Sequence, residues 1–331
     1  MMDTVTLPRL YLDEDNHPRP SQTSQRRRSI RPVSAVLTII TSLPLAAFLF
    51  WHRQLPDAGG LTMALESFLP WLGLLSLPLL ISAVRSRSGL AWLAWLTPVV
   101  IWCVLFIPAM LPRTQAAPAT GQSFTLSVAT QNVQASTVPM ASGSALMAQS
   151  ADLVALQELS PGKIPQNAEQ IYPCQDAGGT VALLSKYPVL ESSRLELGGV
   201  AWSRALHATV QTPGGELSIY VVHAASVRLG EHADRDVMLS NLDRIISQDK
   251  SSRIMVLGDF NAASTDRALA GFQDKFIESL PDSGGLGFTW PSSFPVTRPD
   301  HIFSKGLETK SSKVLEQAGS DHRGLQSTLT W

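Results

Sequence analysis

A chain of 331 residues with a formal net charge of −1 divides sharply near residue 115. Residues 1–119 carry a net charge of +4 and residues 120–331 a net charge of −5, counting Lys and Arg against Asp and Glu. Affinity for duplex nucleic acid comes largely from phosphate neutralisation by Lys and Arg. We therefore do not expect the acidic second part, residues 120–331, to bind polyanions over its whole surface. Its one cysteine, Cys174, excludes an internal disulfide there, and no spacing with Cys103 suggests a zinc site.

The first third contains three long apolar runs, at about 33–51, 61–84 and 90–111. Each is long enough to cross a hydrocarbon core of about 30 Å. The first run is too long for the apolar core of a signal peptide and leads into aromatic residues instead of a small-residue cleavage site. Internal prolines are tolerated in membrane bundles. We therefore predict three transmembrane helices over 33–111, with Glu66 as the weak point of the second.

The arginines around these runs indicate the orientation of the chain. Six arginines lie within about seven residues before the first run or between the second and third runs, whereas Arg53 alone lies in the first connection and Arg113 just after the third run. The positive-inside rule then puts the N-terminus in the cytoplasm and the C-terminal part outside, on the periplasmic side of a multi-pass inner-membrane protein. The six are Arg26, Arg27, Arg28, Arg31, Arg85 and Arg87.

Two polar segments flank the predicted membrane helices. Residues 1–32 are polar and rich in Pro and Arg, which predicts a disordered cytoplasmic tail. Residues 112–122 contain Pro, Ala, Thr and Gly, which is typical of a linker. Residues 123–331 remain for a separate domain.

The domain at 123–331 reads as short β-type runs separated by turn signals. Residues 124–130 alternate apolar and polar side chains, as a half-buried strand does. Helical patterns occur at 144–149, 231–247 and 266–272. About 210 residues of this kind predict a single α+β domain with packed sheets. Further strands are expected at 153–156, 181–184, 206–211, 217–222 and 254–257.

Polar side chains recur beside these apolar runs and would share one chemistry if the fold gathered them. Carboxylate and amide oxygens suit a hard cation such as Mg²⁺ or Mn²⁺, which polarises a phosphoryl oxygen. Two histidines, His223 and His322, add groups that titrate near neutrality, and Asp300 is the carboxylate placed to orient one imidazole. The oxygen donors are Asn132, Glu158, Asp259, Asn261 and Asp321.

Each of these elements alone has an ordinary structural reading. Gly258-Asp259 is typical of a turn that ends a strand, and Gln157-Glu158 of a solvated or helix-capping pair. Ser320-Asp321 is typical of a helix N-cap, and His223 on an apolar strand of a satisfied core histidine. Their order and joint presence favour a functional site.

That order resembles the endonuclease/exonuclease/phosphatase superfamily, the metal-dependent fold of DNase I-like nucleases. The resemblance covers about 124–330, and three spans before such a domain look like a membrane-anchored bacterial subgroup. It implies a four-layer α/β/β/α sandwich with the site at one end of two sheets. The motifs that carry it are Ala129-Thr130-Gln131-Asn132, Asp152 to Glu158, Ala182 to Pro188, the strand ending at His223, Gly258-Asp259-Phe260-Asn261, Asp300 and Ser320-Asp321-His322.

The resemblance also implies a role for each matching residue. Asn132 and Glu158 would hold the metal with Asp321 assisting, and Asp259 and Asn261 would contact the attacking water, the leaving oxygen and the phosphate. His322, oriented by Asp300, would be the general base or the imidazole that stabilises the phosphate, and His223 would bind the scissile phosphate. The strand before His223 reads Tyr220-Val221-Val222 and lacks the Asn-Thr that often stands there.

The sequence thus predicts a membrane-anchored, divalent-metal-dependent phosphoesterase with Mg²⁺ or Mn²⁺ as its cofactor. Nuclease activity is the default by resemblance, while a membrane anchor also suits a phosphodiesterase or phosphatase acting on lipids or their head groups. A non-catalytic binding module of the same fold is the third alternative. The expected partners are a phosphate ester, either nucleic acid or phospholipid head group, and the bilayer, and no obligate protein partner is evident.

Overall fold

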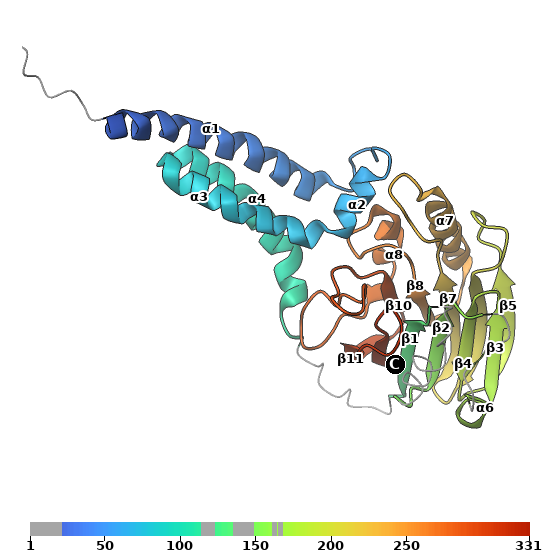
Figure 1. Ribbon diagram of the computed structural model, residues 1–331. Coiled ribbons are helices and arrows are strands. Elements are labelled where there is room, and N and C mark those ends of the chain that lie inside the picture. Colours follow the sequence, from blue (N-terminus) through green and yellow to red (C-terminus); the bar gives the residue numbers. More distant parts are fainter. Residues whose placement is uncertain (1–21, 114–122, 135–148, 161–163, 165–167) are drawn as a thin grey trace, which may run out of the picture.

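The computed structural model describes residues 22–113, 123–134, 149–160, 164 and 168–331. Figure 1 shows a helical bundle that projects from a domain of strands and short helices. Most of the linker predicted at 112–122 and the helix predicted at 144–149 lie outside the described residues.

The bundle contains three helices long and apolar enough to cross a membrane, Arg31–Trp51, Leu69–Ser86 and Gly89–Met110, as predicted. Its first helix begins earlier than expected, at Gln22, so residues 22–32 are helical where a disordered tail was predicted. Gln and Arg are good helix formers, which favours extension of the helix beyond the apolar run. The elements are α1 (Gln22–Trp51), α2 (Leu61–Ser67), η1 (Leu69–Leu75), α3 (Ser76–Ser86) and α4 (Gly89–Met110).

The second predicted span, 61–84, is divided in the structure. Helix α2 forms a separate turn that ends at Ser67, and the apolar span starts at Leu69. The reason is Glu66, whose fully buried carboxylate pairs with the Arg267 guanidinium of the C-terminal domain at 2.9 Å. Burying the Glu66 carboxylate in the hydrocarbon of a membrane would cost free energy, whereas outside the span it pairs with the Arg267 guanidinium.

Two six-stranded sheets form the centre of the C-terminal domain. The first has the order β11-β12-β1-β2-β4-β3 and the second β5-β6-β7-β8-β10-β9. The first sheet contains β1 (Thr125–Asn132), β2 (Leu153–Gln157), β3 (Cys174–Gly178), β4 (Val181–Ser185), β11 (Glu308–Val314) and β12 (Leu325–Thr330). The second contains β5 (Val189–Leu195), β6 (Ala205–Thr212), β7 (Gly215–His223), β8 (Ile254–Asp259), β9 (Ile277–Glu278) and β10 (Asp300–Lys305).

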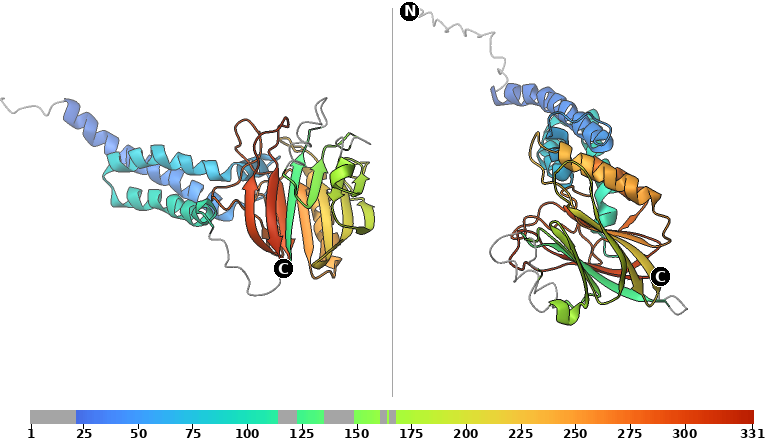
Figure 2. Two further views of the ribbon diagram at one scale, coloured as in Figure 1. Left: turned by 90° about the horizontal axis from the view of Figure 1, so that it is seen from below. Right: turned by 90° about the vertical axis from the view of Figure 1, so that its right-hand side faces the viewer.

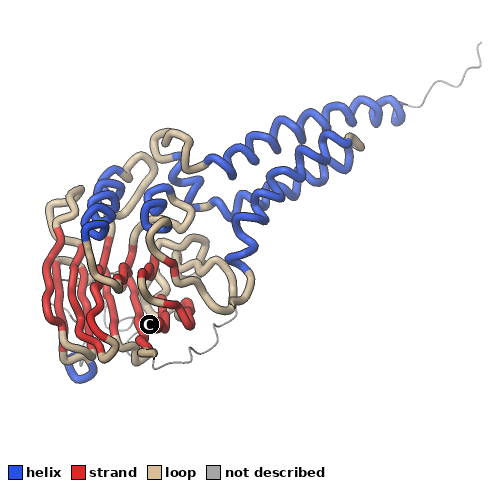
Figure 3. Tube along the Cα trace, turned by 180° about the vertical axis from the view of Figure 1, so that it is seen from behind, coloured by secondary structure: helices blue, strands red, loops and turns tan. Residues whose placement is uncertain are grey.

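The layers follow from which side chains each strand buries. Val128, Leu183, Ile219 and Leu257 belong to a core between the sheets. A second core packs the outer face of the second sheet against α7 (Ala233–Gln248) and the η2–α8 segment (Arg267–Leu269 and Ala270–Gln273), and a third covers the first sheet beside α6 (Ala168–Ile171). Figures 2 and 3 show the two strand layers face to face, with α7 across the outside of one. This is the predicted α/β/β/α sandwich.

Strand register brings the polar strand ends to one edge. In the second sheet, β7 and β8 run parallel with His223 opposite Asp259, and β8 pairs antiparallel with β10 so that Asp300 is also opposite Asp259. In the first sheet, β1 and β2 run parallel with Asn132 opposite Gln157. Neighbouring parallel strands end together, so residues distant in sequence meet at this edge.

Candidate active site

The first sheet supplies Asn132, at the end of β1, and Glu158, directly after the neighbouring strand β2. Glu158 comes directly after β2 and has a left-handed φ of 55°. A non-glycine residue held in this region stores strain, which is common at functional sites. The Asn132 Nδ2 donates to Glu158 Oε1 at 3.0 Å and to Asp259 Oδ2 at 2.9 Å. One amide therefore joins both sheets at the site.

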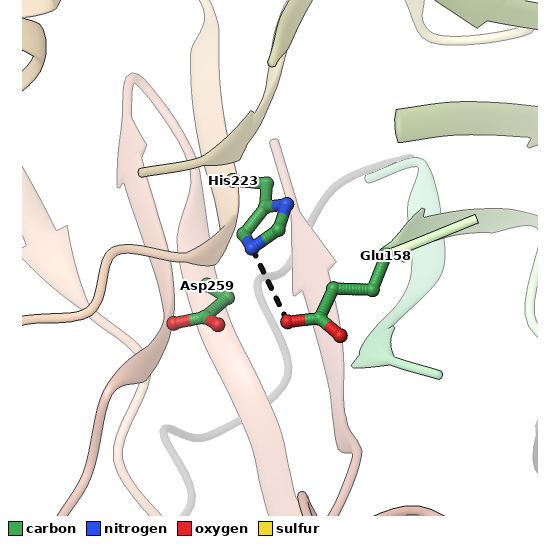
Figure 4. A group of neighbouring side chains, drawn as sticks. All are labelled: Glu158, His223 and Asp259. Atoms are coloured by element: carbon green, nitrogen blue, oxygen red, sulfur yellow. Dashed lines mark ion pairs between the residues drawn. The ribbon is translucent and has the colours of Figure 1, made fainter. Parts of the chain in front are cut away.

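Glu158, His223 and Asp259 form the first cluster (Figure 4). The His223 Nε2 lies 3.5 Å from Glu158 Oε1. One ligand atom from each of the three residues lies within 4.8 Å of the others. His223 and Asp259 are buried, and Glu158 is partly exposed toward solvent.

The donor set of this cluster fits a divalent cation. Two carboxylates, Glu158 and Asp259, converge on the same Asn132 amide, where like charges repel each other unless positive charge lies between them. Carboxylate and amide oxygens are the ligands that Mg²⁺ and Mn²⁺ prefer. Burial raises the pKa of Asp259, although the charge of His322 opposes this shift. A bound cation would favour the carboxylate form in the same way.

The second cluster is Asp259, Asp300 and His322. The His322 Nδ1 lies 2.9 Å from Asp300 Oδ2, which also accepts a 2.6 Å hydrogen bond from Thr289. This arrangement points the His322 Nε2 toward Asp259 Oδ2, 3.9 Å away. Burial on its own would lower the pKa of His322, but the charges of Asp300 and Asp259 outweigh it and raise the pKa to about 10.

Asn261 contacts a residue of these clusters directly, whereas Asp321 belongs to neither cluster. The Asn261 backbone N–H donates to Asp259 Oδ1 at 2.8 Å, and its Nδ2 donates to the carbonyl of Ala224 at 3.0 Å. Asn261 is thus part of the site. The Asp321 carboxylate accepts from the Trp290 indole at 3.3 Å, and neither cluster of potential metal ligands in the described chain includes it. Its charge does contribute to the raised pKa of His322.

The sequence analysis missed Arg204, and it named Ser320 only within the Ser320-Asp321-His322 motif. Arg204 precedes β6 and contacts both ring nitrogens of His223. Burial lowers the pKa of its guanidinium, while the charges of Asp259 and Glu158 oppose this. Ser320 joins the two halves of the site, because its hydroxyl donates to the Asn132 carbonyl at 2.7 Å. A single Arg or Ser beside a strand gives no sequence signal of such a role.

The fold and the site together define a hydrolase scaffold of the phosphoesterase type. A family model described as Endonuclease/Exonuclease/phosphatase family matches residues 129–322, more than half of the chain. The chain belongs to this family.

Several known proteins are similar to this chain. A "UPF0294 protein" of Vibrio campbellii (strain ATCC BAA-1116) is 28% identical over 130 residues, which span 38% of this chain and 44% of that protein. The structure of D. rerio TDP2 complexed with single strand DNA product has a TM-score of 0.53 at 21% identity, covering 62% of this chain and 98% of the other. The Bacteroides thetaiotaomicron VPI-5482 mannosyl-6-phosphatase Bt3783 has a TM-score of 0.50 at 16% identity, covering 62% and 100%. These two structures share the fold.

Proposed function

We propose that the chain is a membrane-anchored, divalent-metal-dependent phosphoesterase whose site is the edge formed by β1, β2, β7, β8 and β10. The observation that supports this most is the meeting of Glu158, Asp259 and the His322–Asp300 pair, which come from both sheets. Acidic ligands beside an oriented imidazole are what metal-assisted hydrolysis of a phosphate ester requires.

Each residue has a distinct part in this proposal. Glu158 and Asn132 would hold Mg²⁺ or Mn²⁺, which would supply Lewis-acid chemistry for the phosphoryl and leaving oxygens. Asp259 and Asn261 orient the attacking water. Asp300 keeps the His322 Nδ1–H bonded, so Nε2 faces the cleft to exchange a proton or donate to the phosphate.

The remaining residues act on the phosphate and on His322. His223 and the Arg204 guanidinium that contacts it supply positive charge for the phosphate among acidic neighbours. Asp321, whose carboxylate accepts from the Trp290 indole, raises the pKa of His322 through its charge and would assist at the metal.

The catalytic domain is proposed to lie outside the cytoplasm, with the N-terminus inside. Arginine placement supports this, and so does the bundle, because α1 begins at the end of the bundle away from the domain and ends beside α2 at the domain (Figure 1). A thiol-labelling experiment tests it. A cysteine introduced at exposed Asp274 should react with a membrane-impermeant maleimide in intact spheroplasts. Labelling only after lysis would reverse the proposed topology.

The activity is tested with the full chain in nanodiscs, using bis(p-nitrophenyl) phosphate, p-nitrophenyl phosphate and a single-stranded oligonucleotide. Hydrolysis of at least one substrate should require Mg²⁺ or Mn²⁺ and stop with EDTA. Asp259→Asn and His322→Ala should each lower kcat by about 10² or more. Asp274→Asn makes the same chemical change at an exposed position and should leave kcat within about twofold. Equal activity of all variants would leave the non-catalytic binding module as the better reading.

A further inference from the structure

A cavity of about 310 Å³ opens directly beside the catalytic residues Asn261 and His322. One of its walls does not belong to the catalytic domain. It is formed by Met63 and Phe68 of the α2 segment, which Figure 1 shows between the bundle and the catalytic domain. Leu229 lines the cavity as well. The membrane anchor therefore completes the cleft.

Buried polar contacts fix this wall to the catalytic domain. The fully buried Glu66 accepts from the backbone N–H of Arg267 at 3.2 Å in addition to its ion pair with that side chain. One residue further along the segment, Thr297 donates to the Ser67 carbonyl at 3.2 Å. The Trp71 indole donates to the Val296 carbonyl at 2.8 Å. The wall is thus held by the η2 segment and by the loop at 296–297, and Thr297 of that loop also lines the cavity.

The cavity lies next to the start of the second candidate membrane span. Phe68 is 40% exposed and is followed directly by Leu69, the first residue of the second span. Large apolar side chains of the lining are also open to solvent, since Leu229 is 68% exposed and Trp290 is 38% exposed. Exposed apolar groups grouped in this way mark contact with a membrane or an apolar ligand.

The charge of the lining does not suit a nucleic acid strand. Among the described lining residues, Arg228 is the only Lys or Arg, and it is highly exposed and paired with Glu231 at 3.8 Å. A site that binds the phosphate backbone of a nucleic acid strand needs several Lys or Arg side chains along its groove. Met63, Phe68 and Leu229 instead form an apolar surface that suits a hydrocarbon chain.

We infer that the substrate is a membrane amphiphile, a phosphate ester with one hydrocarbon-bearing arm. This inference rests on the proposed function and names its substrate class. The phosphate lies at Asn261 and His322, and the hydrocarbon arm lies along Phe68, Met63 and Leu229 toward the bilayer. A water oxygen bonds to phosphorus, the bond to the leaving oxygen breaks, and the water proton passes to that oxygen, which gives an alcohol and a phosphate product.

The test compares two soluble diesters that differ only in the arm, methyl p-nitrophenyl phosphate and octyl p-nitrophenyl phosphate, on the full chain in nanodiscs. The octyl ester is kept below its micellar concentration. We expect kcat/KM to be at least about tenfold higher for the octyl ester, because small changes of apolar contact in a pocket change kcat/KM by about tenfold or more. Phe68→Gln and Leu229→Gln should each reduce this octyl-to-methyl ratio severalfold.

Leu190→Gln is the matched control, because Leu190 is 51% exposed on β5 at the far edge of the second sheet and should preserve the ratio. Leu229 is exposed, so its variant reports on the cleft even if Phe68→Gln folds poorly. Equal kcat/KM for the two esters, or a preference for a single-stranded oligonucleotide that both variants retain, would overturn the inference and leave the phosphoesterase intact. Absence of hydrolysis of all three substrates would overturn the proposed function itself.

Discussion

Gly258 is the point where the two parallel strands β7 and β8 approach most closely at the site. Its φ is +138°, and a Cβ built there would lie 2.0 Å from the Val222 carbonyl oxygen. Side-chain carbons do not approach backbone oxygens this closely, so Gly258→Ala must separate the strands by about 1 Å. Val222 is paired with Gly258, and the next pair in register is His223 with Asp259. The displacement therefore reaches the catalytic cluster directly.

The expected consequences of Gly258→Ala follow from this displacement. Misplacing catalytic groups by about 1 Å costs on the order of 10² in rate, so kcat should fall at least that far. Overpacking between buried strands should lower the free energy of unfolding by about 1–3 kcal/mol. Kinetics with bis(p-nitrophenyl) phosphate and thermal unfolding of the full chain in nanodiscs measure the two effects.

Gly285→Ala is the control for backbone strain alone. Gly285 also has a positive φ, +94°, but a Cβ there would meet no atom within 4 Å, and the residue lies away from both clusters. This variant should lose stability but retain kcat within about twofold. If Gly258→Ala kept full activity and stability, the close approach of β7 and β8 would not be what positions Asp259.

Three further substitutions test the site and the anchor. Asp300→Asn keeps a hydrogen-bonding group but removes the buried charge that orients the imidazole, and kcat should fall by about 10² or more, while Michaelis constants change little. Arg204→Gln removes the cation that contacts His223 and should raise KM for phosphate esters or lower kcat by about tenfold or more. Arg204→Lys keeps the positive charge and should lose less activity. An equal loss in both variants would point to packing instead of charge. Glu66→Gln leaves the partly exposed Arg267 guanidinium without its carboxylate partner and should lower the free energy of unfolding by about 1–3 kcal/mol. An unchanged unfolding temperature would show that other contacts hold α2 in place.

The sequence by itself determined the order of secondary structure around the site. Alternation and turn residues located β1, β7 and β8, and the polar residue that ends each of them was evident. The joint order of these endings identified the family, which the family model confirmed over residues 129–322. These features are local in sequence, because strand period, turn chemistry and hydropathy depend on neighbouring residues only.

The tertiary structure alone decided which distant side chains become partners. Hydropathy predicted one span over residues 61–84, although Glu66 lies outside the membrane span. The local sequence could not show this, because the partner of Glu66 is Arg267, 201 residues later in the chain. Asp321 was expected by resemblance to assist at the metal, and the structure adds a partner that no local pattern indicates, the Trp290 indole. Arg204 was missed for the same reason, since only the pairing of β6 with β7 brings it to His223. A local pattern places a residue at the end of an element, whereas its charge partner is chosen by how the sheets and the anchor pack against each other.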